Sequence, residues 1–205
     1  MMKFPITFIA LALAIIVQPT ASADAITEAY VQENANDVLN SLNNPELSPA
    51  ERRLAFQEYM DQFANINAVA RFVVGKYSRR FSDQEMLEYQ DAFRDYALTV
   101  YENYFDEYKG QSVFVSGSTD RNARDSIVDT TILSSDGREM YVRWRVLKRG
   151  DKYQVVDVAL NTDGNVIWLA IEQQAQFLSI LDRSNGSAQD LVAKIRDMTA
   201  DIRDS

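Results

Sequence analysis

The sequence contains no cysteine and no histidine among its 205 residues. Their absence excludes zinc sites built on thiolate or imidazole, thiol redox chemistry, and catalysis by a Ser–His or Cys–His pair. Basic residues are also the minority, because 21 Lys and Arg stand against 30 Asp and Glu and give a net charge of −9. This acidic balance argues against electrostatic binding to nucleic acid and against passive adhesion to an anionic membrane. We expect no metal and no cofactor.

The first 23 residues have the organisation of a secretory signal peptide. Lys3 is their only charge, residues 4–17 are almost wholly apolar, and Ala21-Ser22-Ala23 places small residues where a signal peptidase reads. The apolar run is shorter than the roughly 20 residues that a membrane-spanning helix needs. The sequence therefore predicts export to the periplasm, cleavage after Ala23, a single domain over residues 24–205 and no stable membrane insertion.

Helical patterns come first, strands follow and helices return, an order typical of an α+β domain. Ser48 with Glu51 and Ser82 with Glu85 have the spacing of capping boxes at two helix starts. The strand spacing predicts a curved four-stranded antiparallel sheet. Helices are predicted over residues 24–42, 66–74, 83–109 and 165–183, after residue 187, and from Pro49 onward through Met60. Strands are predicted over 111–117, 125–134 and 152–160, and along the alternating residues 140–146.

The longest predicted helix, residues 83–109, has an unusually aromatic apolar face. Phe93, Tyr96, Val100 and Tyr104 recur at steps of three and four residues along it. Such a face either packs into a solid core or stands off the sheet and leaves an apolar cavity, which suits an apolar ligand. The pattern alone leaves both interpretations open.

Two further groups of residues have both a structural and a functional interpretation. Asp157 lies in the apolar run 155–158, where a carboxylate must be hydrogen-bonded or paired. It either holds a loop or an arginine, or acts as the general base of an enzyme built on a cone-shaped sheet. Lys76, Arg79 and Arg80 form a basic cluster that either lies on a solvated loop or sits near a phosphate.

Several segments resemble the MlaC family of periplasmic lipid carriers, also called toluene-tolerance auxiliary proteins. Residues 71–77 resemble the family's R-x-x-L-G-x-x-W segment, with Val74 in place of Leu, and residues 153–158 resemble its W-K-V-x-D-V segment. Residues 164–181 resemble the closing G-x-S-L-x-x-x-x-R-x-x-F-x-x-I-L segment, although Ile167-Trp168-Leu169 stands where Ser-Leu is usual. That departure resembles the hopanoid-associated branch of the family.

The resemblance implies a carrier without chemistry of its own, whose apolar pocket holds acyl chains while the head group stays near solvent. It implies transfer of a phospholipid or hopanoid-like lipid between an outer-membrane lipoprotein complex and an inner-membrane ABC-transporter complex. The alternative is a periplasmic adaptor whose aromatic residues merely fill its core. Lys76, Arg79 and Arg80 are the head-group candidates. The predicted pocket residues are Phe72, Phe93, Tyr96, Val100, Tyr104, Val142, Trp144, Val146, Val158, Trp168 and Leu169.

The charge of the exported chain bears on where it would exchange lipid. Removing Lys3 with the signal peptide leaves the protein still more acidic. Because such a protein is repelled by anionic bilayers, we expect handover at protein docking sites.

Overall fold

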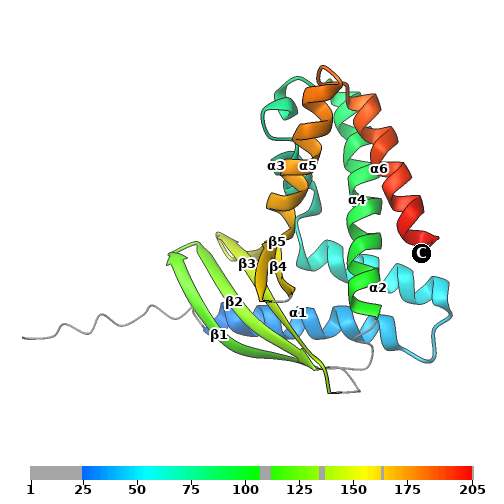
Figure 1. Cartoon of the computed structure of the whole chain (residues 1–205). Coiled ribbons are helices and arrows are strands. Elements are labelled where there is room, and N and C mark those ends of the chain that lie inside the picture. The colour runs from blue at the N-terminus through cyan, green and yellow to red at the C-terminus, as the bar shows by residue number, and fades with distance from the viewer. Residues whose placement is uncertain (1–24, 107–111, 134–136, 163, 205) are drawn as a thin grey trace, which may run out of the picture.

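The computed structural model describes residues 25–106, 112–133, 137–162 and 164–204. The predicted signal peptide and its cleavage site lie outside the described residues. Figure 1 shows an antiparallel sheet with α1 along one side and a block of helices, α3 to α6, standing beyond it. The elements, in chain order, are α1 (Ala25–Asn43), α2 (Pro49–Phe63), α3 (Ile66–Val73), the 3₁₀ turn η1 (Gly75–Arg79), α4 (Asp83–Asp106), β1 (Val113–Asn122), β2 (Asp125–Leu133), β3 (Glu139–Arg149), β4 (Lys152–Thr162), β5 (Asn165–Trp168), α5 (Leu169–Arg183) and α6 (Ala188–Arg203).

The sheet is an antiparallel meander in the order β1-β2-β3-β4-β5, so the predicted α+β class is confirmed. It has five strands rather than the predicted four. Residues 165–168 form β5 and not the start of a helix, because Gly164 adopts a φ of +86° and turns the chain back onto β4. Val166, Ile167 and Trp168 are residues that favour strands once such a partner is present.

The central strand β3 has the alternation that its sequence predicts, with Val142, Trp144 and Val146 buried on one face. Its pairing with β4 is interrupted by a bulge. Val146 pairs with Val155 and Arg145 pairs with Asp157, so Val156 is an extra residue in β4. A bulge bends its strand and redirects the neighbouring side chains, and here it precedes the buried Asp157.

Both predicted capping boxes are present. The Ser48 backbone N–H donates to Glu51 Oε2 at 2.8 Å, and the Glu51 N–H donates to Ser48 Oγ at 3.3 Å. The same reciprocal pair joins Ser82 and Glu85, at 2.9 and 3.3 Å. These bonds satisfy amides that a helix start leaves open, and they fix where α2 and α4 begin.

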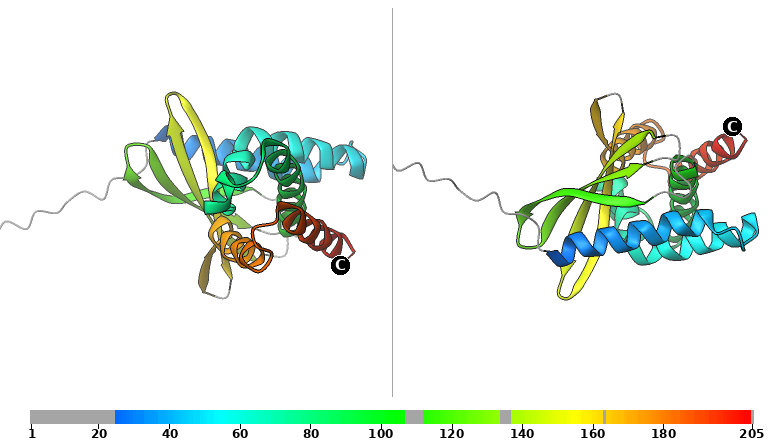
Figure 2. Two further views of the ribbon diagram at one scale, coloured as in Figure 1. Left: turned by 90° about the horizontal axis from the view of Figure 1, so that it is seen from above. Right: turned by 90° about the horizontal axis from the view of Figure 1, so that it is seen from below.

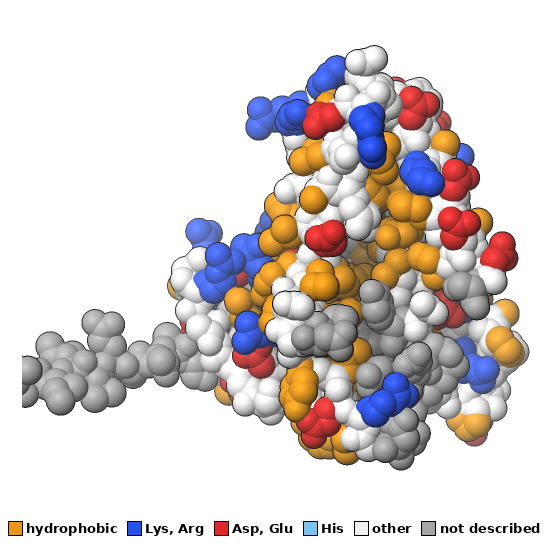
Figure 3. Space-filling model, in the orientation of Figure 1, with side chains coloured by type: hydrophobic (Ala, Val, Ile, Leu, Met, Phe, Trp, Pro, Cys, Tyr) orange, Lys and Arg blue, Asp and Glu red, His pale blue; other side chains and the backbone are white. Residues whose placement is uncertain are grey.

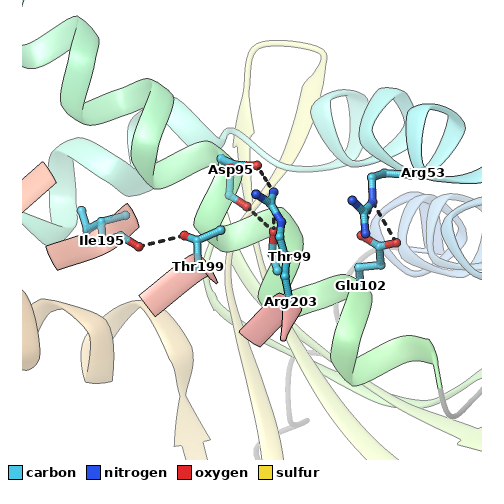
Figure 4. A network of polar contacts seen from close by, with 7 residues as sticks. All are labelled: Arg53, Asp95, Thr99, Glu102, Ile195, Thr199 and Arg203. Carbon is cyan, nitrogen blue, oxygen red and sulfur yellow. Dashed lines mark hydrogen bonds and ion pairs between the residues drawn. The ribbon is translucent and has the colours of Figure 1, made fainter. Parts of the chain in front are cut away.

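Helix α4 is the centre of the helical block and is held by polar contacts on two sides (Figure 4). Arg203, at the end of α6, donates to Asp95 and to Thr99 on α4. Arg53 on α2 donates to both oxygens of Glu102, at 3.0 and 3.2 Å. These exposed pairs stabilise little individually, but together they set the position of α4 against its neighbours.

The buried apolar side chains form one core cluster with members from all six α-helices and from strands β1 to β4. Across the described residues, no helix combines the length and the apolar character needed to cross a bilayer.

Candidate functional site

Two small apolar cavities adjoin each other between the helical block and the sheet. The central cavity has a volume of about 30 Å³, and the lateral cavity, between α4 and α5, has a volume of about 40 Å³. They share four wall residues: Val69 on α3, and Phe93, Ala97 and Tyr101 on α4. The central cavity is completed by Met60, Phe63, Ala64, Ile66, Trp144, Val155, Val156, Asp157 and Val158. The lateral cavity is completed by Tyr96, Val100, Leu169, Ala170 and Gln173.

The cavities are present where an apolar pocket was predicted, but they are far smaller than an acyl chain requires. Sites for small molecules usually measure about 300–1,000 Å³. The space is filled by aromatic rings at the α4–α5 contact. The Phe177 ring lies 6.1 Å from that of Phe93 and 6.3 Å from that of Tyr96, and Phe93 lies 5.9 Å from Tyr89. The aromatic face of α4 therefore combines the two interpretations of its pattern. Most of it packs into the core, and part of it lines the two small cavities.

The surface over the lateral cavity is apolar. Figure 3 shows hydrophobic side chains gathered along α5, around a hollow between α5 and α4. Leu169 and Gln173 from the first turns of α5 line the lateral cavity and remain partly exposed. The lateral cavity is thus the part of the site nearer to solvent.

Asp157 lies in the wall of the central cavity as a structural carboxylate. Its Oδ1 accepts hydrogen bonds from the backbone N–H groups of Val158 and Ala170, both at 2.9 Å. Burial raises the pKa of Asp157, while the two backbone donors and Arg145 act in the opposite direction. Ala170 lies in the first turn of α5, whose N-cap Trp168 supplies no side-chain acceptor. Asp157 therefore caps α5 from the neighbouring strand, which agrees with the structural interpretation.

Tyr101 is the second ionisable group of the central cavity. Burial raises its pKa above the ordinary value, and the Asp157 carboxylate raises it further. Its phenol is therefore neutral across the physiological pH range. Tyr101 lines both cavities and adds no negative charge to either wall.

Six of the eleven predicted pocket residues line the cavities, and four of the other five do not. Val142 and Val146 are buried on the same face of β3 but line neither cavity. Phe72 is 47% exposed, because α3 buries Ile66, Ala70 and Val73 and turns Phe72 away. Trp168 ends β5 beside the cavities without lining them, and the Tyr104 side chain lies outside the described residues. The six lining residues are Phe93, Tyr96, Val100, Trp144, Val158 and Leu169.

The basic cluster lies away from both cavities. Lys76 Nζ is 3.1 Å from Asp182 Oδ1, near the C-terminal end of α5. The Arg80 guanidinium lies over the Tyr77 ring at 5.0 Å, and Arg79 is exposed at the end of η1. None of the three residues is in the wall of the central or the lateral cavity. Lys76, Arg79 and Arg80 therefore do not border the cavities as a head-group site would.

Sequence reasoning missed three of the four residues that line both cavities. Val69 follows Ile66 by one helical step in α3, and Ala97 and Tyr101 follow Phe93 by four and eight residues in α4. That spacing places them on the Phe93 face. Ala97 was the least visible of these residues, because a small side chain contributes little to an apolar pattern and yet leaves the space that forms a cavity.

Within the described parts of the chain, acidic side chains form no group of three or more that could hold a metal ion.

Comparison with known proteins gives a family and a fold. A family model described as MlaC protein matches residues 32–197. The fold is similar to the solved structure of a phospholipid-binding protein from Ralstonia solanacearum in complex with a phospholipid, with a TM-score of 0.73 and 19% sequence identity. The match covers 86% of this chain and 98% of that one. Among curated proteins, none matches this sequence.

Proposed function

Because the chain belongs to the MlaC family, we propose that it is a periplasmic carrier that binds a phospholipid by its acyl chains. MlaC proteins are lipid-binding transport proteins and not enzymes. The main structural support for lipid binding by this chain is its pair of adjoining apolar cavities, which share the wall residues Val69, Phe93, Ala97 and Tyr101. The phospholipid held by the structurally similar Ralstonia protein supports the same ligand class.

A carrier is needed because acyl chains do not cross water unaided. Each buried CH₂ group contributes about 0.8 kcal/mol to the cost of leaving an apolar environment. A protein that replaces lipid contacts with contacts to Val, Leu and aromatic side chains makes the transfer nearly neutral. The walls of both cavities are mainly aliphatic and aromatic, with Asp157 in the central wall and Gln173 in the lateral wall.

Lipid uptake requires the two cavities to enlarge and merge. Val69, Phe93 and Tyr101 line both cavities, and in this proposal their side chains separate the two spaces. Rotation of these side chains away from the Ala97 position joins the two spaces without breaking a helix. The chains would then occupy the joined cavity, with the head group at the lateral opening by Leu169 and Gln173.

The proposal also covers the route of the protein, its exchange partners and the identity of its lipid. We infer that the chain is exported with cleavage after Ala23, and that it exchanges lipid with an outer-membrane lipoprotein complex and an inner-membrane ABC-transporter complex. A phospholipid is the proposed cargo. A hopanoid-like lipid is the alternative that the segment around Trp168 suggested.

Organic extraction of protein purified from the periplasm, followed by mass spectrometry, tests the proposal. About one phospholipid per protein is expected, and the masses identify its head group. A second sample, stripped of lipid and refolded, should take up phospholipid from vesicles. Failure of both would favour the adaptor with a filled core, the alternative that the small volume of the cavities supports.

A further inference from the structure

One end of the sheet carries five basic side chains on two neighbouring hairpin tips. Arg121 and Arg124 belong to the β1–β2 tip, and Lys148, Arg149 and Lys152 belong to the β3–β4 tip. The tips touch, because the Lys148 N–H donates to the Arg124 carbonyl at 3.0 Å. Both views of Figure 2 place these tips together at the end where α1 begins. We call these five residues the basic tip patch.

Most of the charge in the basic tip patch is available to a partner. Arg124, Arg149 and Lys152 are exposed, and none of them forms an ion pair with any other residue that the structure describes. Among the nearby carboxylates, Asp125 pairs with Arg145 at 2.9 Å and with Arg121 at 3.2 Å. Asp120, which accepts a hydrogen bond from Ser126, and Asp151 keep their negative charges and are outnumbered by the cations of the two tips.

Apolar and aromatic side chains lie beside these cations. Ile26, in the first turn of α1, is 62% exposed and lies one helical turn before Tyr30. The Tyr30 ring lies 5.7 Å from that of Tyr153, and Lys148 Nζ lies 4.9 Å over Tyr153. Cations, tyrosines and an exposed aliphatic residue together are typical of surfaces that bind the interface of an anionic membrane. Binding of an acidic protein would need only the cations and would not require the exposed Ile26.

We propose that this end of the molecule is a reversible docking surface for an anionic lipid bilayer, which it contacts through the basic tip patch and Ile26. The surface adds a membrane-contact step to the proposed carrier, and it does not depend on lipid being held in the cavities. It also departs from the expectation that the acidic net charge keeps the protein off anionic bilayers.

The geometry reconciles docking with a net charge of −9. When the tips face the bilayer, the strands extend away from it, and β3 alone has 11 residues, or roughly 36 Å of extended chain. Charges are screened beyond about 8 Å at physiological ionic strength. Figure 1 shows the helical block beyond the sheet, so its acidic side chains lie farther from the docking end than the basic tip patch and act on the bilayer more weakly.

The proposed docking end is also connected to the central cavity by a row of rings. Tyr153 is followed by Tyr30, Phe63 and Trp144, with successive centroid distances of 5.7, 5.6 and 5.1 Å. Phe63 and Trp144 line the central cavity. The docked end is thus separated from the lipid site by packed side chains and not by bulk solvent.

Vesicle co-sedimentation of the mature chain tests the proposal. We expect binding at low salt to phosphatidylcholine vesicles that contain about a third phosphatidylglycerol, weak binding to pure phosphatidylcholine, and loss of binding as salt rises. The triple variant Arg124→Glu, Arg149→Glu, Lys152→Glu should bind at least about tenfold more weakly, since each cation near an anionic surface contributes to affinity. Ile26→Ser should weaken binding less.

A matched control separates the patch from net charge. The variant Arg183→Glu, Lys194→Glu, Arg196→Glu makes the same change in charge at exposed positions of α5 and α6, and it should bind like the wild type. Equal loss in both triple variants, or no wild-type binding to the anionic vesicles, overturns the proposal. Binding to polyglutamate without binding to vesicles also overturns it, in favour of an acidic protein partner. Circular dichroism checks the fold, and the lipid content of the variants tests the carrier function separately.

Discussion

At the scale of single residues, Asp157 shows how a buried carboxylate is given a structural role. Its Oδ1 receives two backbone N–H groups, one from β4 and one from the first turn of α5. The positive end of the helix dipole also favours a carboxylate at this point. One residue thereby joins the sheet to the helix that borders the lateral cavity.

Replacing Asp157 separates this hydrogen-bonding role from its charge. Asp157→Ala leaves two buried N–H groups without their acceptor and should lower the free energy of unfolding by about 2 kcal/mol. Asp157→Asn keeps a side-chain oxygen and should cost less than about 1 kcal/mol. Urea unfolding of the two variants measures the difference, and equal losses would contradict the capping role.

The raised pKa of Asp157 predicts a pH dependence with a definite sign. Because burial raises the pKa in the folded state above that in the unfolded state, the folded protein binds this proton more tightly. The resulting stabilisation is fully present below the unfolded pKa and is lost as pH rises through the raised folded pKa. The wild type should therefore gain stability relative to Asp157→Asn as pH falls from 7 through that window. A constant difference between the two would count against the raised pKa.

Two glycines with positive φ, Gly186 and Gly150, differ in the space around them and allow backbone strain to be separated from a steric clash. Gly186 has a φ of +81°, and a Cβ there would lie 2.7 Å from Tyr77 Cε1. Gly150 has a φ of +62° but open space around the same position. Gly150→Ala should cost about 1 kcal/mol from backbone strain alone, whereas Gly186→Ala should cost about 3 kcal/mol because the Tyr77 ring must also move. Thermal unfolding that gave equal costs would show that the Tyr77 contact is soft.

At the scale of whole elements, α1 protects the open edge of the sheet. Gln32 donates to the Val113 carbonyl and accepts from the Val115 N–H at 3.0 Å. Asn36 Oδ1 accepts from the Val113 N–H at 2.9 Å. Two carboxamides thus take the place of a neighbouring strand, and an exposed edge strand is otherwise a site of self-association.

Removing these carboxamides should expose the edge. The double variant Gln32→Ala, Asn36→Ala should lower the free energy of unfolding by about 2 kcal/mol and increase self-association in light scattering. Asn34→Ala is the control, because Asn34, on the same helix, donates to the Tyr30 carbonyl within α1 and forms no bond to the described part of β1. It should change stability by less than about 0.5 kcal/mol. Identical behaviour of the two variants would refute the protective role.

The sequence was sufficient for elements whose signals are local. The capping boxes at Ser48 and Ser82, the alternation in β3 and the long aromatic helix are each determined by neighbouring residues. The strand β5 was missed because its conformation depends on pairing with β4 after the turn at Gly164. The strand-favouring residues Val166, Ile167 and Trp168 form too short a run to outweigh a helical pattern that continues into α5.

The cavity walls were only partly predictable for the same reason. Phe93, Tyr96 and Val100 follow from helical periodicity, but the size of the space depends on how rings from α4 and α5 interlock. Phe72 was misplaced because the short helix α3 turns it outward. Lys76 instead pairs with Asp182 on α5, a partner more than 100 residues away that no local pattern indicates.

At the scale of the whole molecule, the distribution of charge matters more than its sum. The chain is acidic overall, yet the basic tip patch gathers cations at one end of the sheet. A protein of this kind can be repelled from a membrane in most orientations and attracted in one.

Lipid binding by this protein requires the two cavities to join into a single site. Ala97 lines both of them, while Ala92, on the same helix, is buried and lines neither. Ala97→Leu fills the shared space and should change stability by less than about 1 kcal/mol, whereas Ala92→Leu overpacks the core and should cost about 1–3 kcal/mol.

The most direct measurement is the amount of phospholipid bound per protein, by mass spectrometry, in the wild type and these two variants. We predict bound lipid in the wild type and in Ala92→Leu, and its loss in Ala97→Leu with the fold intact. Full lipid occupancy in Ala97→Leu, or none in the wild type, would contradict the account.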